Sequence, residues 1–235
     1  MIEQHHAAGP PHLASLGPLV VDRFALPGTD DIVSIVRPGD IDRLLDSAAG
    51  DPEQNLPYWA ELWPSGIALA AAIARQPDEL RGVRCLELGC GLGVTALAAV
   101  RAGADLLATD YAPPALALCR HNCLVNTGRE PETLAMNWRR PSNQLRTRAG
   151  PGYPVVLAAD VLYERRDIDP LLDLIDWLVA PDGVFWLAEP GRPPAAAFLE
   201  QAAERGWSGE IETIAGPWPD PHDRDVVVRA HRLRR

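Results

Sequence analysis

The stretch CLELGCGLGVTAL, residues 85–97, joins one acidic side chain to three closely spaced glycines. Glu87, Gly89, Gly91 and Gly93 form the pattern E-x-G-x-G-x-G, between an apolar run typical of a strand and an alanine-rich run typical of a helix. Because glycine has no Cβ, such a turn can bend tightly and lets a ligand approach the backbone closely. The pattern therefore predicts a cofactor site where the strand ends.

The spacing of the glycines and the acidic residue narrow the class of cofactor. A dinucleotide-binding turn has the pattern G-x-G-x-x-G, whereas here Val94 stands in the last glycine's place and the third glycine comes one residue early. The carboxylate of Glu87 would repel a pyrophosphate and favours a cationic cofactor. Asp110 ends the next predicted strand, 21 residues after Gly89, where a carboxylate can accept hydrogen bonds from both hydroxyls of a ribose. Alone, Asp110 would more often be a turn or cap residue, but its distance from the glycine turn favours the ribose.

A second stretch, LPYWAELWPSGIALA at 56–70, places large rings directly before a predicted helix. Trp59 and Trp63 can lie over the mouth of the cofactor site and exclude water, and the faces of their rings attract cations. Pro57 and Pro64 restrict the backbone and reduce the entropy lost when the segment becomes ordered. The alternative is that both rings only pack an N-terminal element against the domain.

Strand-like and helix-like patterns alternate downstream of residue 65. The predicted strands are 83–88, 105–109, a weak one near 132–136, 155–159, 183–189, and the two C-terminal runs EIETIAG and DVVVRAHRL. The predicted helices are 65–75, 93–102, 113–126, 170–179 with Asp169 as cap and Pro170 in the first turn, and 194–205. This alternation predicts an α/β fold with a parallel sheet and right-handed crossovers, and the final strand pair predicts an antiparallel edge. The main flexible insertion is expected at 139–154.

The N-terminal part of the chain has a different pattern. The runs 19–26 and 31–37 predict a β-hairpin, 41–48 predicts a short helix, and residues 50–52 predict a linker. We therefore divide the chain into three parts: a flexible tail at 1–18, an accessory hairpin and helix at 19–55, and the main domain at 56–235.

Composition bears on partners and location. The net charge of −10 disfavours nucleic acid as a partner, and every cationic side chain apart from histidine is arginine, because the sequence has no lysine. No apolar run has the length of a membrane span and the N-terminus lacks the pattern of a signal peptide, so we expect a cytoplasmic protein that binds no membrane. The four cysteines have no metal-ligand spacing, which predicts reduced thiols and no metal site. The oligomeric state is not predicted.

The glycine turn and Asp110 resemble those of the class I methyltransferases, which depend on S-adenosylmethionine. The resemblance covers roughly 56–235, and the two antiparallel C-terminal strands match the way that fold ends. It implies a doubly wound, Rossmann-like sheet of seven strands, mostly parallel with an antiparallel C-terminal strand. It also implies that S-adenosylmethionine binds at Trp59, Trp63, Glu87, Gly89, Gly91, Gly93 and Asp110.

Three further motifs resemble one family of seven-stranded protein-lysine methyltransferases, which includes those that modify the electron-transfer flavoprotein β subunit. They are the aromatic stretch before the glycine turn, ADVLY at 159–163 with the D-x-x-Y pattern, and EPGRP at 189–193. The resemblance places Asn137 and Trp138 beside the adenine. Asp160 lies where α/β folds bind ligands, so it is expected to orient the acceptor amine or accept its proton, and Tyr163 to form a pocket wall. The alternatives are a capping role for Asp160 and a packing role for Tyr163.

The resemblance implies an N-methyltransferase that acts on a lysine side chain of a protein substrate. The segment Ala60-Glu61-Leu62 is more acidic than expected for the flavoprotein-modifying branch, which leaves the acceptor open. One alternative is a methyltransferase for a small amine or a nicotinamide-like pyridine. Another is a cofactor-binding module without catalysis, which the presence of the glycine turn, Asp110 and D-x-x-Y together disfavours.

Overall fold

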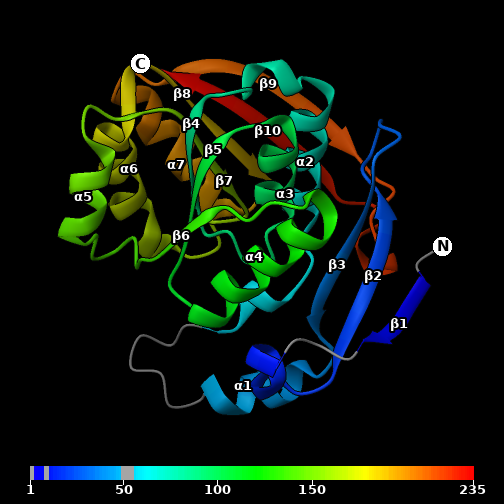
Figure 1. The fold of residues 1–235 in the computed structure, drawn as a ribbon. Coiled ribbons are helices and arrows are strands. Elements are labelled where there is room, and N and C mark those ends of the chain that lie inside the picture. The colour runs from blue at the N-terminus through cyan, green and yellow to red at the C-terminus, as the bar shows by residue number, and fades with distance from the viewer. Residues whose placement is uncertain (1–2, 8–10, 49–55) are drawn as a thin grey trace.

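The computed structural model describes residues 3–7, 11–48 and 56–235, and its centre is a sheet of seven strands with helices on both faces (Figure 1). The order of the strands across the sheet is β6-β5-β4-β7-β8-β10-β9. The strands are β4 (Arg84–Leu88), β5 (Asp105–Asp110), β6 (Glu132–Ala135), β7 (Tyr153–Ala159), β8 (Val179–Glu189), β9 (Ser208–Ala215) and β10 (Val227–Arg234).

The direction of the strands follows from what connects them. Strands β4 to β8 are joined by helical crossovers and pair in parallel, as βαβ units require. Between β9 and β10 the structure has only the short 3-10 turn Pro221–Asp223, and β10 pairs antiparallel with both β8 and β9. The predicted fold class, a doubly wound and mostly parallel sheet with an antiparallel C-terminal end, is confirmed.

The helices form one layer on each face of the sheet. One face is covered by α2 (Pro64–Arg75), α3 (Val94–Ala102) and α4 (Pro113–Thr127), and the other by α5 (Asn143–Ala149), α6 (Ile168–Leu178) and α7 (Pro193–Glu204). Because side chains alternate along a strand, Cys85 packs into the first core and its neighbour Leu86 into the second. No helix among the described residues is both long and apolar enough to cross a bilayer.

A small antiparallel sheet, with β2 (Leu19–Ala25) between β1 (Glu3–Ala7) and β3 (Ile32–Pro38), packs beside α4, and α1 (Ile41–Ala48) follows it. Two side chains of α4 bind the outer edge of β3. Asn122 accepts from Val36 N at 2.8 Å and donates to Val36 O at 2.9 Å, and Asn126 makes the same pair of bonds to Ser34. The predicted hairpin and short helix are confirmed, and the side-chain amides cover a strand edge that would otherwise be unpaired.

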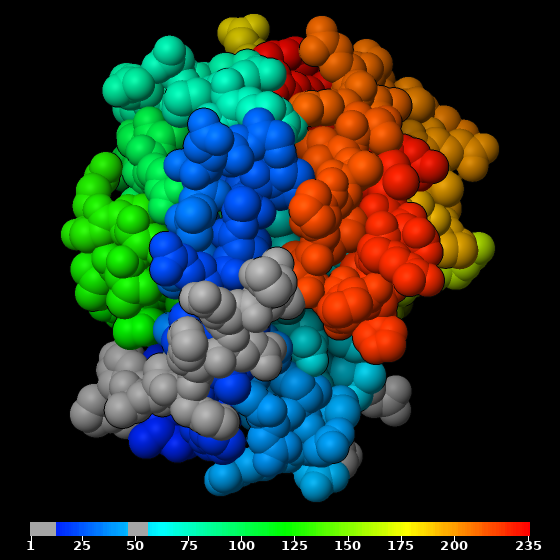
Figure 2. Space-filling view, turned by 90° about the vertical axis from the view of Figure 1, so that its right-hand side faces the viewer, coloured from blue at the N-terminus to red at the C-terminus, as the bar shows by residue number. Residues whose placement is uncertain are grey.

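The accessory sheet also lies beside the C-terminal part of the chain. In Figure 2 the blue N-terminal residues adjoin the orange residues near β9. A cavity there is lined by residues of both parts: Asp22, Arg37, Glu61, Leu62, Pro219, Asp220 and Pro221.

Three expectations differ from the structure. Within the predicted flexible tail, β1 pairs with β2, because β2 offers a free strand edge. The 3-10 turn Pro11–Leu16 buries Leu13 and Leu16 in the core, because the accessory sheet offers an apolar surface. Within the predicted flexible insertion, α5 forms because the Ser142 hydroxyl accepts from Leu145 N and caps it. Helix α6 begins two residues before the expected start, with Asp167 as its N-cap. The predicted linker at 50–52 lies outside the described residues.

Candidate active site

A pocket opens where β4, β5 and β7 end. In an open α/β sheet the carboxyl ends of the strands are where ligands bind. The residues that line it are Tyr58, Trp59, Glu61, Trp63, Gly66, Glu87, Gly89, Cys90, Gly91, Leu92, Val94, Thr95, Asp110, Tyr111, Trp138, Ala159, Asp160, Val161 and Tyr163. Nine of the eleven site residues predicted from sequence are among them, and Gly93 and Asn137 are not.

The three glycines of the turn all have a positive φ, of 67°, 48° and 83°, which side chains rarely adopt. A Cβ on Gly91 would come within 3.3 Å of Trp59 O, so this glycine lets the aromatic segment lie against the turn. A Cβ on Gly93 would lie 2.7 Å from Cys119 Cα, which shows that Gly93 serves the packing of α3 on α4. Gly91 therefore shapes the pocket, whereas Gly93 holds the helix behind it.

Asp110 is 4% exposed and lies opposite the glycine turn. Its Oδ2 accepts from Gly91 N at 2.9 Å and its Oδ1 from Ala112 N at 3.0 Å. Burial raises the pKa of Asp110 to about 6, although hydrogen bonds from the backbone of Ala112, Gly91 and Tyr111 oppose the shift. An ionised carboxylate can accept about four hydrogen bonds, so the three backbone bonds leave Asp110 acceptor capacity for a ribose hydroxyl.

Replacing Asp110 by alanine is expected to weaken cofactor binding by about 1–3 kcal/mol, because the carboxylate is lost as acceptor for the ribose and for Gly91 N. The measurement is calorimetric titration with S-adenosylhomocysteine. Asp105→Ala, at the exposed start of the same strand, is the control and should leave the affinity unchanged. Equal affinities for Asp110→Ala and wild type would exclude Asp110 from the site.

Glu87 is 2% exposed, and its Oε2 is buried without a hydrogen-bond partner among the described residues. Burial, reinforced by the nearby charge of Asp110, raises the pKa of Glu87 well above its usual range. A buried acceptor without a partner is costly unless a ligand supplies a donor. The bottom of the pocket is thus built for a group that donates hydrogen bonds or carries positive charge.

The aromatic segment lines the pocket with Tyr58, Trp59 and Trp63. Trp59 lies in the 3-10 turn Tyr58–Ala60, and Trp63 is the N-cap of α2, with Pro64 as the first helical residue. Trp63 Nε1 donates to Tyr58 O at 2.8 Å, and the two rings meet edge to face at 6.1 Å between centroids. The proline and the hydrogen bond together fix the rings before the helix begins.

Asp160 and Tyr163 line the pocket directly after β7, beside the aromatic segment. The φ of Asp160 is +54°, an unusual backbone for a residue other than glycine, and its side chain is 6% exposed. Arg192 donates from Nε to Asp160 Oδ1 at 2.8 Å and from Nη2 to Oδ2 at 3.2 Å, and its guanidinium lies 5.5 Å from the centre of the Trp63 ring. Tyr163 packs edge to face on Tyr58, at 5.2 Å between centroids.

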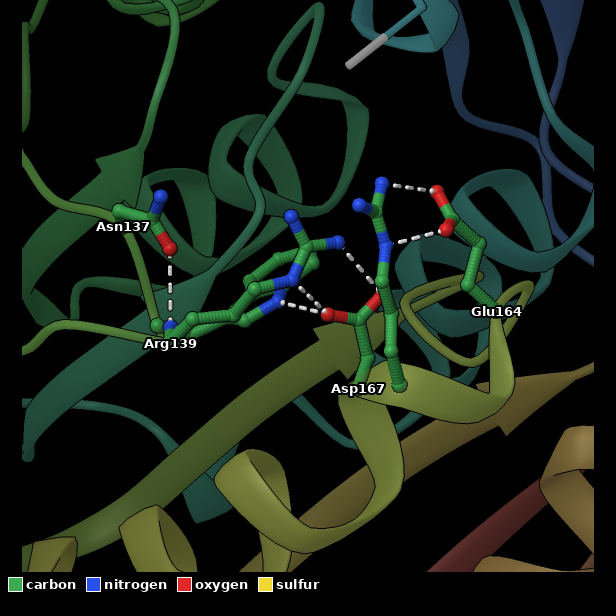
Figure 3. Close-up of polar contacts among 6 residues, drawn as sticks. Asn137, Arg139, Glu164 and Asp167 are labelled. Atoms are coloured by element: carbon green, nitrogen blue, oxygen red, sulfur yellow. Dashed lines mark hydrogen bonds and ion pairs between the residues drawn. The ribbon is translucent and has the colours of Figure 1, made fainter. Parts of the chain in front are cut away.

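Trp138 follows β6 and forms the wall beside the glycine turn. Its Cζ3 lies 3.0 Å from the position that a Cβ on Gly89 would take, so a side chain at this positive-φ residue would be strained and would press on the indole. Asn137 instead has a local role, because its Oδ1 accepts from Arg139 N at 2.9 Å (Figure 3).

Several residues of the site were not singled out from sequence. Tyr58 and Glu61 lie within the aromatic segment, and Tyr111 follows Asp110, so proximity to predicted residues was a signal for all three. Arg192 lies within EPGRP, but nothing in the sequence shows its pairing with Asp160. All four cysteines are free, buried thiols, as expected. Among the described residues no three His, Cys, Asp or Glu side chains lie together so as to hold a metal ion.

Comparison with known proteins places this geometry in context. The lysine methyltransferase family matches residues 55–204. An electron transfer flavoprotein β subunit lysine methyltransferase from Rattus norvegicus is 36% identical over 145 residues, which are 58% of this chain and 52% of the relative. The histone-arginine methyltransferase METTL23 of Xenopus laevis is 28% identical over 136 residues, 56% of this chain and 57% of the relative. The chain thus spans about half the length of these curated relatives.

Solved structures share the fold at low sequence identity. A putative RNA methyltransferase from Pyrococcus horikoshii has a TM-score of 0.59 at 15% identity, over 83% of this chain and 97% of its own. The magnesium protoporphyrin IX methyltransferase of Synechocystis, with S-adenosylhomocysteine bound, has a TM-score of 0.53 at 15% identity, over 72% of this chain and 82% of its own.

The seven-stranded sheet with its antiparallel end, and the glycine turn that faces Asp110 at the end of β5, form the fold of the class I methyltransferases, which use S-adenosylmethionine. Within that class the chain belongs to the lysine methyltransferase family. The residues present fit the cofactor: Glu87 offers an unused buried acceptor to an ammonium group, and Asp110 keeps acceptor capacity for a ribose hydroxyl. The predicted class of enzyme and the predicted cofactor are confirmed.

Proposed function

We propose that this enzyme methylates the side-chain amine of a lysine in a protein substrate. The observation that supports this most is a group of neighbouring side chains that line one part of the pocket. There the Asp160 carboxylate lies with the rings of Tyr58, Trp63 and Tyr163, which suits an amine on an apolar stem. Aromatic rings attract a cation and enclose its stem, and a carboxylate orients the amine by accepting its hydrogen bonds.

Asp160 is proposed to position the acceptor amine. Both of its oxygens already accept from Arg192, and each keeps a further acceptor position. An amine that donates to one of them would be held at a fixed angle inside the pocket. The positive φ of Asp160 supports a role at the site, because such strained backbone clusters where ligands bind.

The surrounding rings are proposed to favour the neutral amine. A lysine amine has a reference pKa of about 10.4 and must lose its proton before it acts as a nucleophile. Removal from water disfavours the charged form, and the guanidinium of Arg192 near Asp160 does the same by repulsion. When bound, S-adenosylmethionine supplies an electrophilic methyl group on a sulfonium. The residues of the chain then contribute mainly alignment.

The names of the relatives support a protein acceptor. Both describe enzymes that modify a basic side chain of a protein, a lysine in one case and an arginine in the other. The same ring-lined wall would also suit a small amine or a flat, nicotinamide-like pyridine, so the acceptor must be identified by experiment.

The experiment is incubation of the full chain with cell extract and radiolabelled S-adenosylmethionine, followed by separation of the products by size. We expect label in one or a few protein bands, and acid hydrolysis should release it as methyl-lysine. The enzyme is well suited to this assay, because its own sequence contains no lysine and cannot add a methyl-lysine signal. Asp160→Asn, assayed in parallel, is the control for transfer by other enzymes.

Label found only in small molecules would favour the small-amine alternative. Label released as methyl-arginine would identify an arginine as the acceptor, as in the name of the METTL23 relative. Either result would contradict the lysine proposal while leaving the enzyme a methyltransferase.

A further inference from the structure

Asp167 is a buried carboxylate that does not serve the helix on which it lies. It ends the 3-10 turn Arg165–Asp167 and is the N-cap of α6, and its side chain is 0% exposed. An aspartate at an N-cap usually accepts from a backbone N–H of its own helix, but Asp167 makes no such bond. Its two carboxylate oxygens accept hydrogen bonds from side chains outside α6.

Both oxygens of Asp167 bind side chains from the loop after β6. Oδ1 accepts from Trp138 Nε1 at 2.8 Å and from Arg139 Nε at 2.6 Å, and Oδ2 accepts from Arg139 Nη2 at 3.0 Å. Figure 3 shows Arg139 reaching across to Asp167. The carboxylate thus forms a two-pronged ion pair with the Arg139 guanidinium, and hydrogen bonds to charged acceptors, such as the one from the indole N–H, are the stronger kind.

The indole of Trp138 is thus fixed at two opposite edges. Its Nε1 edge is bound to Asp167, and the far edge, at Cζ3, lies against Gly89 in the glycine turn. The ring is only half-buried, so packing leaves one side of it open to the pocket. The hydrogen bond to Asp167 adds a directional restraint on the ring to its packing against Gly89.

We propose that Asp167 is a positioning residue for the cofactor, acting through the N–H of Trp138 to hold the indole as a wall against the nucleoside. Asp167 lies four residues after Tyr163, so it also ties the loop that carries the acceptor wall to the loop that carries Trp138. The inference does not depend on which acceptor is methylated, because its test measures cofactor binding.

The test is a double-mutant cycle with Asp167→Asn and Trp138→Phe, read by calorimetric titration with S-adenosylhomocysteine. Asn cannot satisfy both sets of donors, and Phe keeps a flat ring without the N–H. Each change alone is expected to weaken binding about 10-fold, the scale for loss of a hydrogen bond to a charged group. Together they should weaken it by little more than either alone, since both remove the same bond.

Asp176→Asn is the matched control. Asp176 also binds an indole and guanidinium groups, but it does not line the pocket. It accepts from Trp207 Nε1 at 3.0 Å, from Arg205 Nη1 at 2.9 Å and from Arg235 Nη1 at 2.7 Å. This control should lower the unfolding temperature and leave cofactor affinity unchanged.

Three results would overturn the proposal. The first is wild-type cofactor affinity in Asp167→Asn, and the second is a double variant whose loss of affinity equals the product of the two single losses. The third is an equal loss of affinity in Asp176→Asn. If Asp167→Asn does not fold, Trp138→Phe decides alone, and wild-type affinity in that variant contradicts the proposal.

Discussion

Gly91→Val is expected to abolish measurable binding of S-adenosylmethionine. The φ of Gly91 is +48°, and a Cβ there would meet the Trp59 carbonyl at 3.3 Å, so the branched side chain must push the aromatic segment away from the glycine turn. The bond from Gly91 N to Asp110 would be disturbed in the same movement. A displacement of about 1 Å can cost ~10²-fold where binding or catalysis depends on alignment. Calorimetric titration with S-adenosylhomocysteine measures the loss.

Gly128→Val is the matched control for this prediction. Gly128 has a φ of +72° at the end of α4, and a Cβ there would meet nothing within 4 Å. Valine at Gly128 therefore costs stability through backbone strain alone, and binding should persist. Circular dichroism of both variants separates misfolding from loss of the site. If Gly91→Val folds and binds with wild-type affinity, the glycine turn is not part of the cofactor site.

The parts of the fold that sequence predicted are those set by local pattern. Strand-like runs that alternate with helix-like runs identified the strands of the main sheet. The lack of a helical pattern between the last two strands indicated the antiparallel end. The glycine turn was recognisable because its conformation requires glycine at each of three positions. Local rules were enough wherever the cause of a structure lay within a few residues.

The parts that sequence missed depend on pairing over long distances along the chain. The start of α6 was assigned to the Asp169-Pro170 pair, which resembles a cap, whereas Asp167 occupies the N-cap and binds Trp138 29 residues away. Arg192 was not identified because its partner, Asp160, lies 32 residues before it. Strand β1 likewise forms only because β2 offers an edge. None of these pairings leaves a periodic signal.

Asp160→Asn is expected to separate chemistry from cofactor binding. Turnover on the acceptor should fall by at least ~10²-fold, the lower scale for loss of a group that handles a proton in the transition state. Affinity for the cofactor should change little, because Glu87, Asp110 and Trp138 line other parts of the pocket. Asparagine tolerates the φ of +54° as aspartate does, so the backbone should keep its shape. Initial rates and calorimetric titration on the same preparation give both quantities.

The pH dependence of that variant distinguishes two roles for Asp160. If the carboxylate accepts the proton of the amine, raising the pH should partly restore turnover, since more of the free amine is then present. If it only orients the amine, the deficit should persist at every pH. Arg192→Met is the control, because it breaks the same ion pair but leaves the carboxylate, and it should reduce turnover less. Equal losses in both variants would assign the effect to the ion pair. Proportional loss of turnover and cofactor affinity in Asp160→Asn would place Asp160 in the cofactor site, and wild-type turnover would leave it a structural residue at the end of β7.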